Sequence, residues 1–209
     1  MPTNSVTPGS TITAMNITGR PPLLVLIRHG QSTWNESRTV QGQQDDSVLT
    51  TAGRGQALRA ASELRTYAFD AAISSDLRRT VETASIIGER LNLDVTTTTA
   101  LRERSYGVYE GKLLASLPPH LAGFANGIVH DADARPEGGE SLRDLYIRTA
   151  AFIGQLLAER PHRRLLLVTH GGVVRAARAY CAGITMNEVD WDAVDNCSIW
   201  PLDLTRWSI

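Results

Sequence analysis

Lysine and cysteine are scarce in this sequence. Lys112 is the only lysine among 21 basic residues, and Cys181 and Cys197 are the only cysteines. The two cysteines form no CxxC pair and have no histidine at ligand spacing, which argues against a disulfide scaffold and a zinc site. We expect half-buried thiols in a reducing compartment. The excess of arginine fits a GC-rich genome, so abundance alone indicates no function, although a planar guanidinium grips phosphate better than an ammonium does.

Long apolar runs and an excess of one charge are also absent. No apolar run approaches the roughly 20 residues that cross a bilayer. The formal net charge of −1 gives no global basic field for nucleic acid or a membrane surface. Residues 1–20 lack the basic cluster and apolar core of a secretory signal, so we interpret them as a flexible tail. A cytoplasmic location is therefore expected, and any anion binding has to be local.

The remaining residues, 21–209, have the composition of a single globular domain, since 42% of the chain is apolar and 21% charged. Residues 23–27 (LLVLI) and 165–169 (LLLVT) are short apolar runs, typical of strands buried on both faces. Each run leads to a histidine followed by glycine, at His29 and His170. The two segments therefore share one pattern.

Apolar spacing between and after these runs predicts the other elements. Helices are expected at about 51–67, 77–91, 142–160 and 172–181, and strands at 69–75, 94–98 and 197–204. Strands that alternate with helices indicate an α/β sheet covered by helices. Ligands of such sheets bind beyond the carboxyl ends of the strands, which is where Arg28, His29 and His170 would lie if both apolar strands are central and parallel.

Two further segments contain candidate site residues. Arg78 and Arg79 follow a strand at the start of a helix, where backbone N–H groups and the helix dipole favour an anion. Adjacent helical residues diverge by about 100 degrees, so only one of the two can point into a given pocket. Glu103 is a candidate carboxylate, whereas Glu110 has the simpler interpretation of a turn residue.

Taken in order, four motifs resemble those of the histidine phosphatase superfamily, also called phosphoglycerate-mutase-like. They are Arg28-His29-Gly30, residues 75–80 (SDLRRT), residues 101–103 (LRE) and His170-Gly171-Gly172. The resemblance covers residues 23–204, and residues 41–57, 136–141 (PEGGES) and 196–200 (NCSIW) look most like the bacterial broad-specificity phosphatase branch. It implies a three-layer α/β sandwich with a mixed, mostly parallel sheet and a small inserted cap at about 104–140.

The resemblance also implies roles for individual residues. His29 would be the nucleophile that becomes phosphohistidine, with Glu103 as the proton donor. Arg28, Arg79 and His170 would hold the phosphoryl oxygens, and the family spacing selects Arg79 over Arg78. Substrate contacts are implied for Asn35, Gln41, Gly42 and Gly171. No cofactor and no metal is implied, and no Asp/Glu cluster typical of a magnesium site lies beside these motifs.

Chemistry adds two expectations about this site. A histidine that attacks phosphorus must present a neutral ring nitrogen, so its other nitrogen needs an acceptor, most simply a backbone carbonyl. His170 would serve either protonated or with a donor N–H oriented to the phosphate. Because Arg102 and Arg104 would favour an ionised Glu103 if they pointed toward it, we predict that both point away.

Three functions fit these motifs: a phosphatase for a small phosphorylated metabolite, a cofactor-dependent phosphoglycerate mutase, or a non-catalytic protein that binds phosphorylated ligands. A mutase must retain a small polyanion, yet residues 113–134 contain no lysine or arginine, with His120 and His130 as their only potential cations. We therefore favour the phosphatase and expect both histidines to be surface residues. The substrate stays open, and a homodimer is compatible with the sequence without being specified by it.

Overall fold

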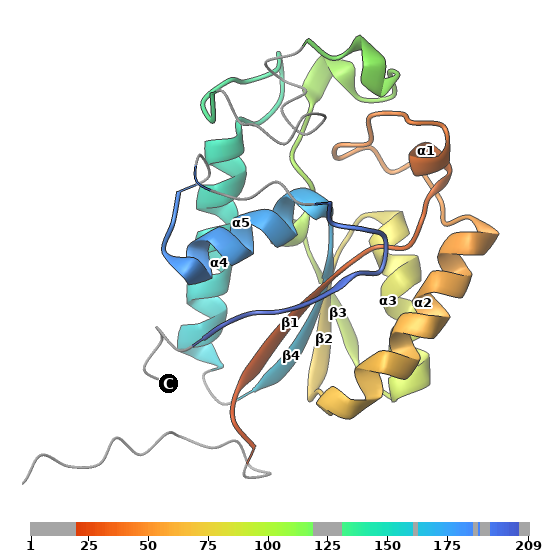
Figure 1. Cartoon of the computed structure of the whole chain (residues 1–209), viewed down its shortest axis with the longest axis vertical. Helices are drawn as coiled ribbons and strands as arrows, with labels where there is room; N and C mark the ends of the chain where they lie inside the picture. Colours follow the sequence, from red (N-terminus) through yellow and green to blue (C-terminus); the bar gives the residue numbers. More distant parts are fainter. Residues whose placement is uncertain (1–19, 119–130, 161–162, 186–187, 189–192, 205–209) are drawn as a thin grey trace, which may run out of the picture.

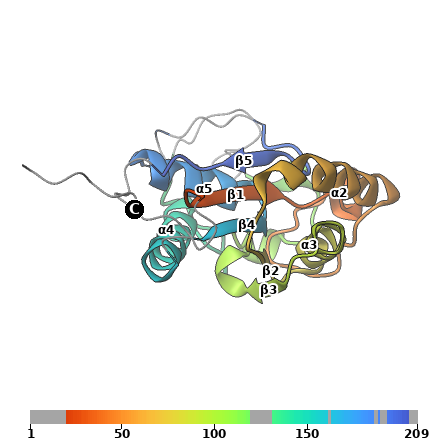
Figure 2. The same ribbon diagram turned by 90° about the horizontal axis from the view of Figure 1, so that it is seen from below.

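The computed structural model describes residues 20–118, 131–160, 163–185, 188 and 193–204. The expected tail, apart from Arg20, lies outside these ranges, as do His120 and His130. Within them the chain forms one five-stranded sheet in the order β3-β2-β4-β1-β5 (Figures 1 and 2). The strands are β1 (Leu23–Arg28), β2 (Ala71–Ser75), β3 (Val95–Thr98), β4 (Arg164–Thr169) and β5 (Ile199–Pro201).

The two apolar runs occupy the centre of the sheet. β1 and β4 are parallel neighbours, and Arg28 at the end of β1 pairs with Thr169 at the end of β4. β2 and β3 continue the parallel order, whereas β5 runs antiparallel to β1. The prediction of a mixed, mostly parallel sheet is confirmed. His29 and His170 consequently leave the sheet at the same edge.

Helices α2 (Thr51–Leu64), α3 (Arg78–Leu91), α4 (Leu142–Glu159) and α5 (Gly171–Ala182) cover both faces of this sheet. The short helix α1 (Thr33–Glu36) lies in the loop after β1, and short 3-10 turns occur at Arg65–Tyr67, Thr99–Leu101, Gly107–Tyr109 and Leu114–Ser116. Side chains of β1 alternate between the faces: Leu24 and Leu26 pack with α4 and α5, whereas Val25 and Ile27 pack with α2 and α3. Figure 2 shows this three-layer arrangement, which confirms the predicted fold class.

The largest differences from the predicted strand boundaries are at β5 and β2. The strand expected at 197–204 is confined to Ile199–Pro201, because Cys197 has a φ of +58° in the left-handed region, and Pro201 has no N–H to extend the ladder. The strand expected from residue 69 begins at Ala71. The central pair of strands, β1 and β4, is as predicted.

Both cysteines are free thiols, as expected. Cys181 is buried rather than half-buried, and Cys197 is half-buried. Burial raises the pKa of the Cys181 thiol to about 11 and that of Cys197 to about 12, because an apolar environment disfavours the thiolate. Neither thiol is therefore set up as a nucleophile at neutral pH.

Candidate active site

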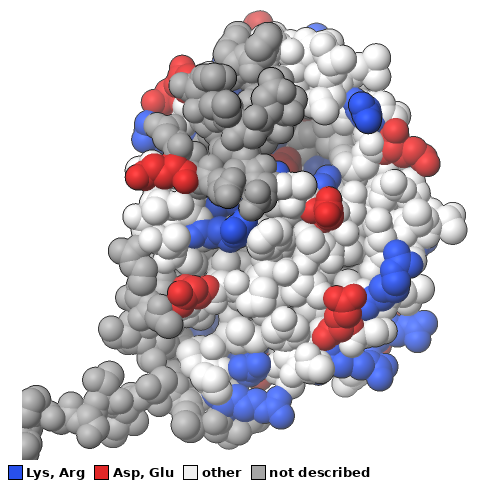
Figure 3. Space-filling model, in the orientation of Figure 1, with Lys and Arg blue, Asp and Glu red and all other residues white. Residues whose placement is uncertain are grey.

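A cavity of about 220 Å³ lies at the carboxyl ends of β1 and β4, and all nine sequence-predicted site residues line it. Figure 3 shows this face of the molecule, which is hollowed below the cap. Residues of the expected cap form one wall: Leu114 lines the cavity, and Leu113 pairs with Thr39 of the opposite loop in an isolated β-bridge. The ends of the strands thus bring together residues from distant parts of the sequence.

His29 is buried directly after β1, with 3% of its surface exposed. Its Nδ1 lies 2.7 Å from the carbonyl oxygen of Gly30. Because a carbonyl can only accept, Nδ1 carries the hydrogen and Nε2 presents its lone pair. Burial, followed by the charges of Arg79 and Arg28, holds the pKa of His29 well below its usual value of 6.5. The structure therefore provides the neutral ring and the backbone acceptor that the sequence led us to expect.

His170 faces the same cavity from the end of β4. Its ring centroid lies 5.2 Å from that of His29, and its Nε2 lies 3.0 Å from the Ser75 hydroxyl. That hydroxyl oxygen accepts the N–H of Leu77 at 3.3 Å, so its own hydrogen can be donated to His170 Nε2, which places a hydrogen on Nδ1. Burial, then Arg79, lowers the pKa of His170 well below 6.5. Of the two forms considered from sequence, the neutral, donor-oriented one is favoured.

Arg28 and Arg79 supply the positive charge of the cavity. Arg28 donates from Nη1 to the carbonyl of Val194 at 2.6 Å. Arg79 is fully buried and donates from its two terminal nitrogens to the carbonyls of Gln44 and Gly42 at 2.9 and 2.7 Å. Burial lowers the pKa of Arg28, and that of Arg79 falls to about 10 for the same reason, so both remain cations at neutral pH.

Several side chains beside the cavity have a buried donor with no hydrogen-bond partner within the described part of the chain. Among these donors are Nε of Arg28, Nε of Arg79 and Nδ1 of His170. A buried donor without an acceptor costs about 1–3 kcal/mol, so proteins rarely leave one without reason. An anion with several oxygen atoms, placed beside His29 Nε2, would satisfy all three.

Glu103 lies at the other side of the cavity with its carboxylate fixed by backbone N–H groups. Its oxygens accept from Arg104 N at 2.8 Å and from Gly172 N at 3.1 Å. Arg102 pairs with Asp76, as predicted, and its guanidinium is directed away from Glu103. Arg104 donates to the carbonyls of Glu140 and Ala134, but its charge still interacts with that of Glu103. Arg104 is nevertheless buried, so it is a structural residue and not a solvated one.

The loop after β1 presents amide groups to the cavity. Oδ1 of Asn35 accepts from the Ser32 backbone at 3.0 Å, and Oε1 of Gln41 accepts from the Ser32 hydroxyl at 2.9 Å. With these oxygens occupied, the NH₂ groups of both amides are the donors left for a ligand. Gly42 has a φ of +49°, and a Cβ there would lie 2.0 Å from Glu110 Oε1, so only glycine fits.

Several functional side chains were missed from the sequence. Asn196 donates from Nδ2 to the carbonyl of His29 at 2.9 Å, which steadies the backbone of the predicted nucleophile. Arg175 and Tyr106 also line the cavity. Arg175 follows Gly171 by one helical turn on α5, so helical spacing could have identified it. Glu110 does not line the cavity but accepts N–H groups of Gln43 and Tyr106, both at 2.9 Å, consistent with its interpretation as a turn residue.

The described residues contain no group of three or more His, Cys, Asp or Glu side chains placed to hold a metal ion. In the same part of the chain, no helix is both long enough and apolar enough to cross a membrane.

The two buried histidines predict how stability depends on pH. Their folded pKa values lie below 6.5, so the unfolded chain binds more protons just below that pH. The free energy of unfolding should therefore rise with pH up to about 6.5 and fall as the pH drops below it, by up to about 1.4 kcal/mol per pH unit for each histidine. Urea unfolding between pH 5 and 7.5 measures this slope. His170→Asn should remove about half of it, and an unchanged slope in this variant would contradict the prediction.

Comparison with known proteins is consistent with this geometry. The family described as the histidine phosphatase superfamily (branch 1) matches residues 24–208. The probable phosphoglycerate mutase GpmB of Salmonella choleraesuis is 35% identical over 179 residues, 85% of this chain and 83% of that protein. A mycobacterial glucosyl-3-phosphoglycerate phosphatase in complex with VO3 superposes with a TM-score of 0.77 at 33% identity, over 87% of this chain and 92% of that one. A phosphoserine phosphatase from Entamoeba histolytica, bound to 3-phosphoglyceric acid, shares the fold, with a TM-score of 0.74 at 24% identity over 88% and 92%.

Proposed function

Because this chain belongs to branch 1 of the histidine phosphatase superfamily, we propose that it hydrolyses a small phosphorylated metabolite through a phosphohistidine formed on His29. The observation that carries the proposal is the presence of buried donors on Arg28, Arg79 and His170 that lack partners within the described residues beside a neutral His29. A phosphoryl group spreads its charge over three equatorial oxygens in the transition state, and these donors can bind them.

In the first step, the lone pair on His29 Nε2 attacks phosphorus as the ester P–O bond breaks. The hydrogen bond from Nδ1 to the Gly30 carbonyl, 2.7 Å long, stabilises the positive charge that develops on the ring. Arg28, Arg79 and His170 bind the transferring oxygens with donors that are already oriented, which lowers the cost of stabilising the developing charge. The scheme uses the side chains of this protein and no metal ion.

Glu103 acts as the acid in the first step and as the base in the second step. Its carboxylic acid gives a proton to the leaving alkoxide, which is otherwise a poor leaving group. The resulting carboxylate takes a proton from the water that attacks phosphohistidine. The N–P bond then breaks, phosphate leaves, and both His29 and Glu103 return to their starting states. The bonds to Arg104 N and Gly172 N support this role because they hold the carboxylate at the cavity.

The cap favours hydrolysis over transfer of the phosphoryl group back to the substrate. Residues 113–134 contain no lysine or arginine, and Leu113 and Leu114 in the described part of this segment are exposed. These two leucines offer no charge to retain a dephosphorylated polyanion while water is excluded. The names of the relatives suggest phosphorylated carboxylic acids as first substrates to test.

A substrate panel tests the proposal directly. Release of phosphate is measured from 3-phosphoglycerate, phosphoserine, glucosyl-3-phosphoglycerate and simple aryl and alkyl phosphates. Isomerisation of 3-phosphoglycerate with a bisphosphoglycerate primer is measured in parallel. We expect net phosphate release from at least one ester. Efficient isomerisation without release would identify a mutase, and vanadate binding without turnover of any ester would identify a non-catalytic binder.

A further inference from the structure

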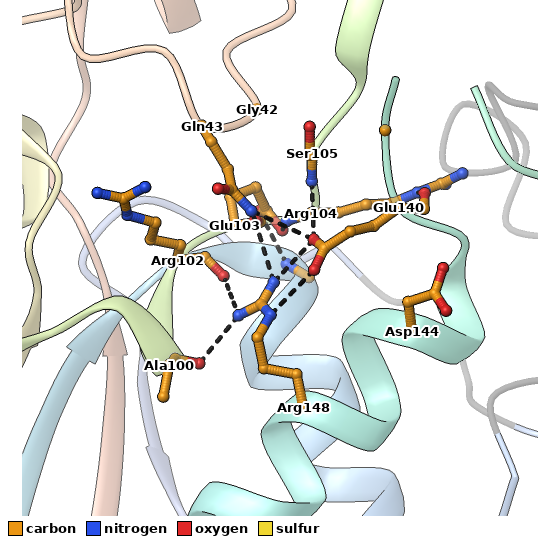
Figure 4. Close-up of polar contacts among 12 residues, drawn as sticks. Gly42, Gln43, Ala100, Arg102, Glu103, Arg104, Ser105, Glu140, Asp144 and Arg148 are labelled. Atoms are coloured by element: carbon orange, nitrogen blue, oxygen red, sulfur yellow. Dashed lines mark hydrogen bonds and ion pairs between the residues drawn. The ribbon is translucent and has the colours of Figure 1, made fainter. Parts of the chain in front are cut away.

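Glu140 and Arg148 form a half-buried ion pair behind Glu103, outside the cavity lining (Figure 4). Glu140 lies in the loop before α4, and Arg148 lies on α4. The ion pair is bidentate: Nε of Arg148 lies 3.0 Å from one carboxylate oxygen of Glu140, and Nη2 lies 2.8 Å from the other. About 22–23% of each side chain is exposed, so solvent screens this pair less than a surface pair.

The other N–H groups of Arg148 hold the backbone that carries Glu103. Nη1 donates to the carbonyls of Ala100 and Arg102, both at 2.9 Å, and Nη2 donates to the carbonyl of Glu103 at 3.3 Å. A guanidinium has five N–H groups, and all five are therefore engaged, two by the carboxylate and three by this one turn of backbone. Figure 4 shows the Arg148 guanidinium directed at the backbone of residues 100–103.

Gln43 connects the same network to the loop that holds Arg79. Its Nε2 donates to the Glu103 carbonyl at 3.1 Å and to Glu140 at 3.3 Å. Its neighbours Gly42 and Gln44 provide the carbonyls that accept from Arg79. The Glu140 carboxylate is thus connected to the backbone of Glu103 through Arg148, and to the loop that orients Arg79 through Gln43. It also accepts the N–H of Ser105 at 3.0 Å.

We infer that Glu140, Arg148 and Gln43 are positioning residues that set where the Glu103 carboxylate stands relative to the phosphoryl group held by Arg79. The inference rests on the proposed function. None of the three lines the cavity, so they act through Glu103 and Arg79 and not on the substrate. Lysine cannot replace Arg148, because an ammonium has three donors and no planar fork.

A displaced Glu103 should slow only the step in which it donates a proton to the leaving group. An acid displaced by about 1 Å can lose on the order of 100-fold in rate, but only where proton donation matters. An alkyl ester such as benzyl phosphate needs a proton on its leaving oxygen. The ester 4-nitrophenyl phosphate has a similar ring but a far better leaving group, so it reacts with little help from an acid.

The experiment compares kcat/KM for these two esters in the full chain. The variants are Arg148→Lys, Gln43→Ala and, as a reference for loss of the acid itself, Glu103→Gln. The matched control is Arg143→Lys, because Arg143 lies on the same helix and pairs with Asp133 at the surface. The ratio of the two kcat/KM values does not depend on the folded fraction, so partial unfolding of a variant cannot imitate the effect.

Arg148→Lys should lower kcat/KM for benzyl phosphate by about 10-fold to 100-fold relative to 4-nitrophenyl phosphate. Gln43→Ala should change the ratio in the same direction by less, and Arg143→Lys should leave it within about twofold. Equal losses on both esters in Arg148→Lys and Gln43→Ala overturn the inference while the proposed function stands. Equal losses in Glu103→Gln overturn the assignment of Glu103 as the acid and this inference with it. No phosphate release by the unaltered chain from any ester of the substrate panel overturns the proposed function.

Discussion

Replacing His29 with alanine is expected to abolish phosphate release, with a loss on the order of 10⁴-fold to 10⁶-fold, as for the removal of other enzyme nucleophiles. Among the described residues, His170 is the nearest candidate replacement. His170 Nε2 is bonded to Ser75, and the two imidazole rings lie 5.2 Å apart, so His170 cannot reach the same phosphorus position in line with the leaving group. Arg28 and Arg79 remain in the variant, so vanadate binding should persist within about tenfold.

Rapid quenching with substrate labelled on phosphorus measures the intermediate. The unaltered protein should carry label as a phosphoramidate, which is stable to alkali and labile to acid, and His29→Ala should carry none. Retained vanadate binding serves as the control for a folded site. Label that stayed on His29→Ala would identify another residue as the nucleophile.

The centre of the fold and the composition of the cavity were predictable from sequence because both depend on local patterns. The runs 23–27 and 165–169 contain mostly branched apolar residues, which suit a strand buried on both faces, and β1 and β4 are those strands. Parallel strands end at one edge of the sheet. That rule alone brings Arg28, His29 and His170 to one place, and the family motifs added the other predicted residues of the cavity, but not Arg175 or Tyr106.

The hydrogen bonds that hold the cavity-lining residues in place were not predictable, since they join segments that are distant in the sequence. Gln43 and Glu140 are 97 residues apart, and Asn196 lies 167 residues from the His29 carbonyl that it binds. No spacing or periodicity marks such pairs in a sequence. The same applies to the short β5, because the left-handed backbone of Cys197 follows from its place beside Arg28, whose carbonyl accepts the Cys197 N–H at 3.0 Å. Local pattern predicts the elements, but tertiary contacts decide where they end and what holds the site.

Arg79→Lys should lower kcat/KM by about 10²-fold to 10³-fold, whereas Arg78→Lys, one residue earlier on α3, should stay within about twofold. Arg79 is fully buried and donates from both terminal nitrogens to the loop carbonyls of Gly42 and Gln44, while its Nε remains available to the phosphoryl group. A lysine has its three donors on one nitrogen and cannot reproduce the planar spread of a guanidinium over these acceptors. Arg78 has 59% of its side chain exposed and pairs with Glu82 at 3.2 Å, so its loss removes only a surface ion pair.

The pH profile separates loss of charge from loss of geometry at this position. Burial already lowers the pKa of the Arg79 guanidinium to about 10, which is harmless at neutral pH. A lysine starts from a pKa of about 10.4 and would be lowered by the same burial, so part of its charge should be lost as the pH rises above neutral. The activity of Arg79→Lys should therefore decline at mildly alkaline pH where the unaltered protein and Arg78→Lys do not. Parallel profiles for all three proteins, or a loss in Arg78→Lys as large as in Arg79→Lys, would contradict the assignment of Arg79 to the phosphoryl site.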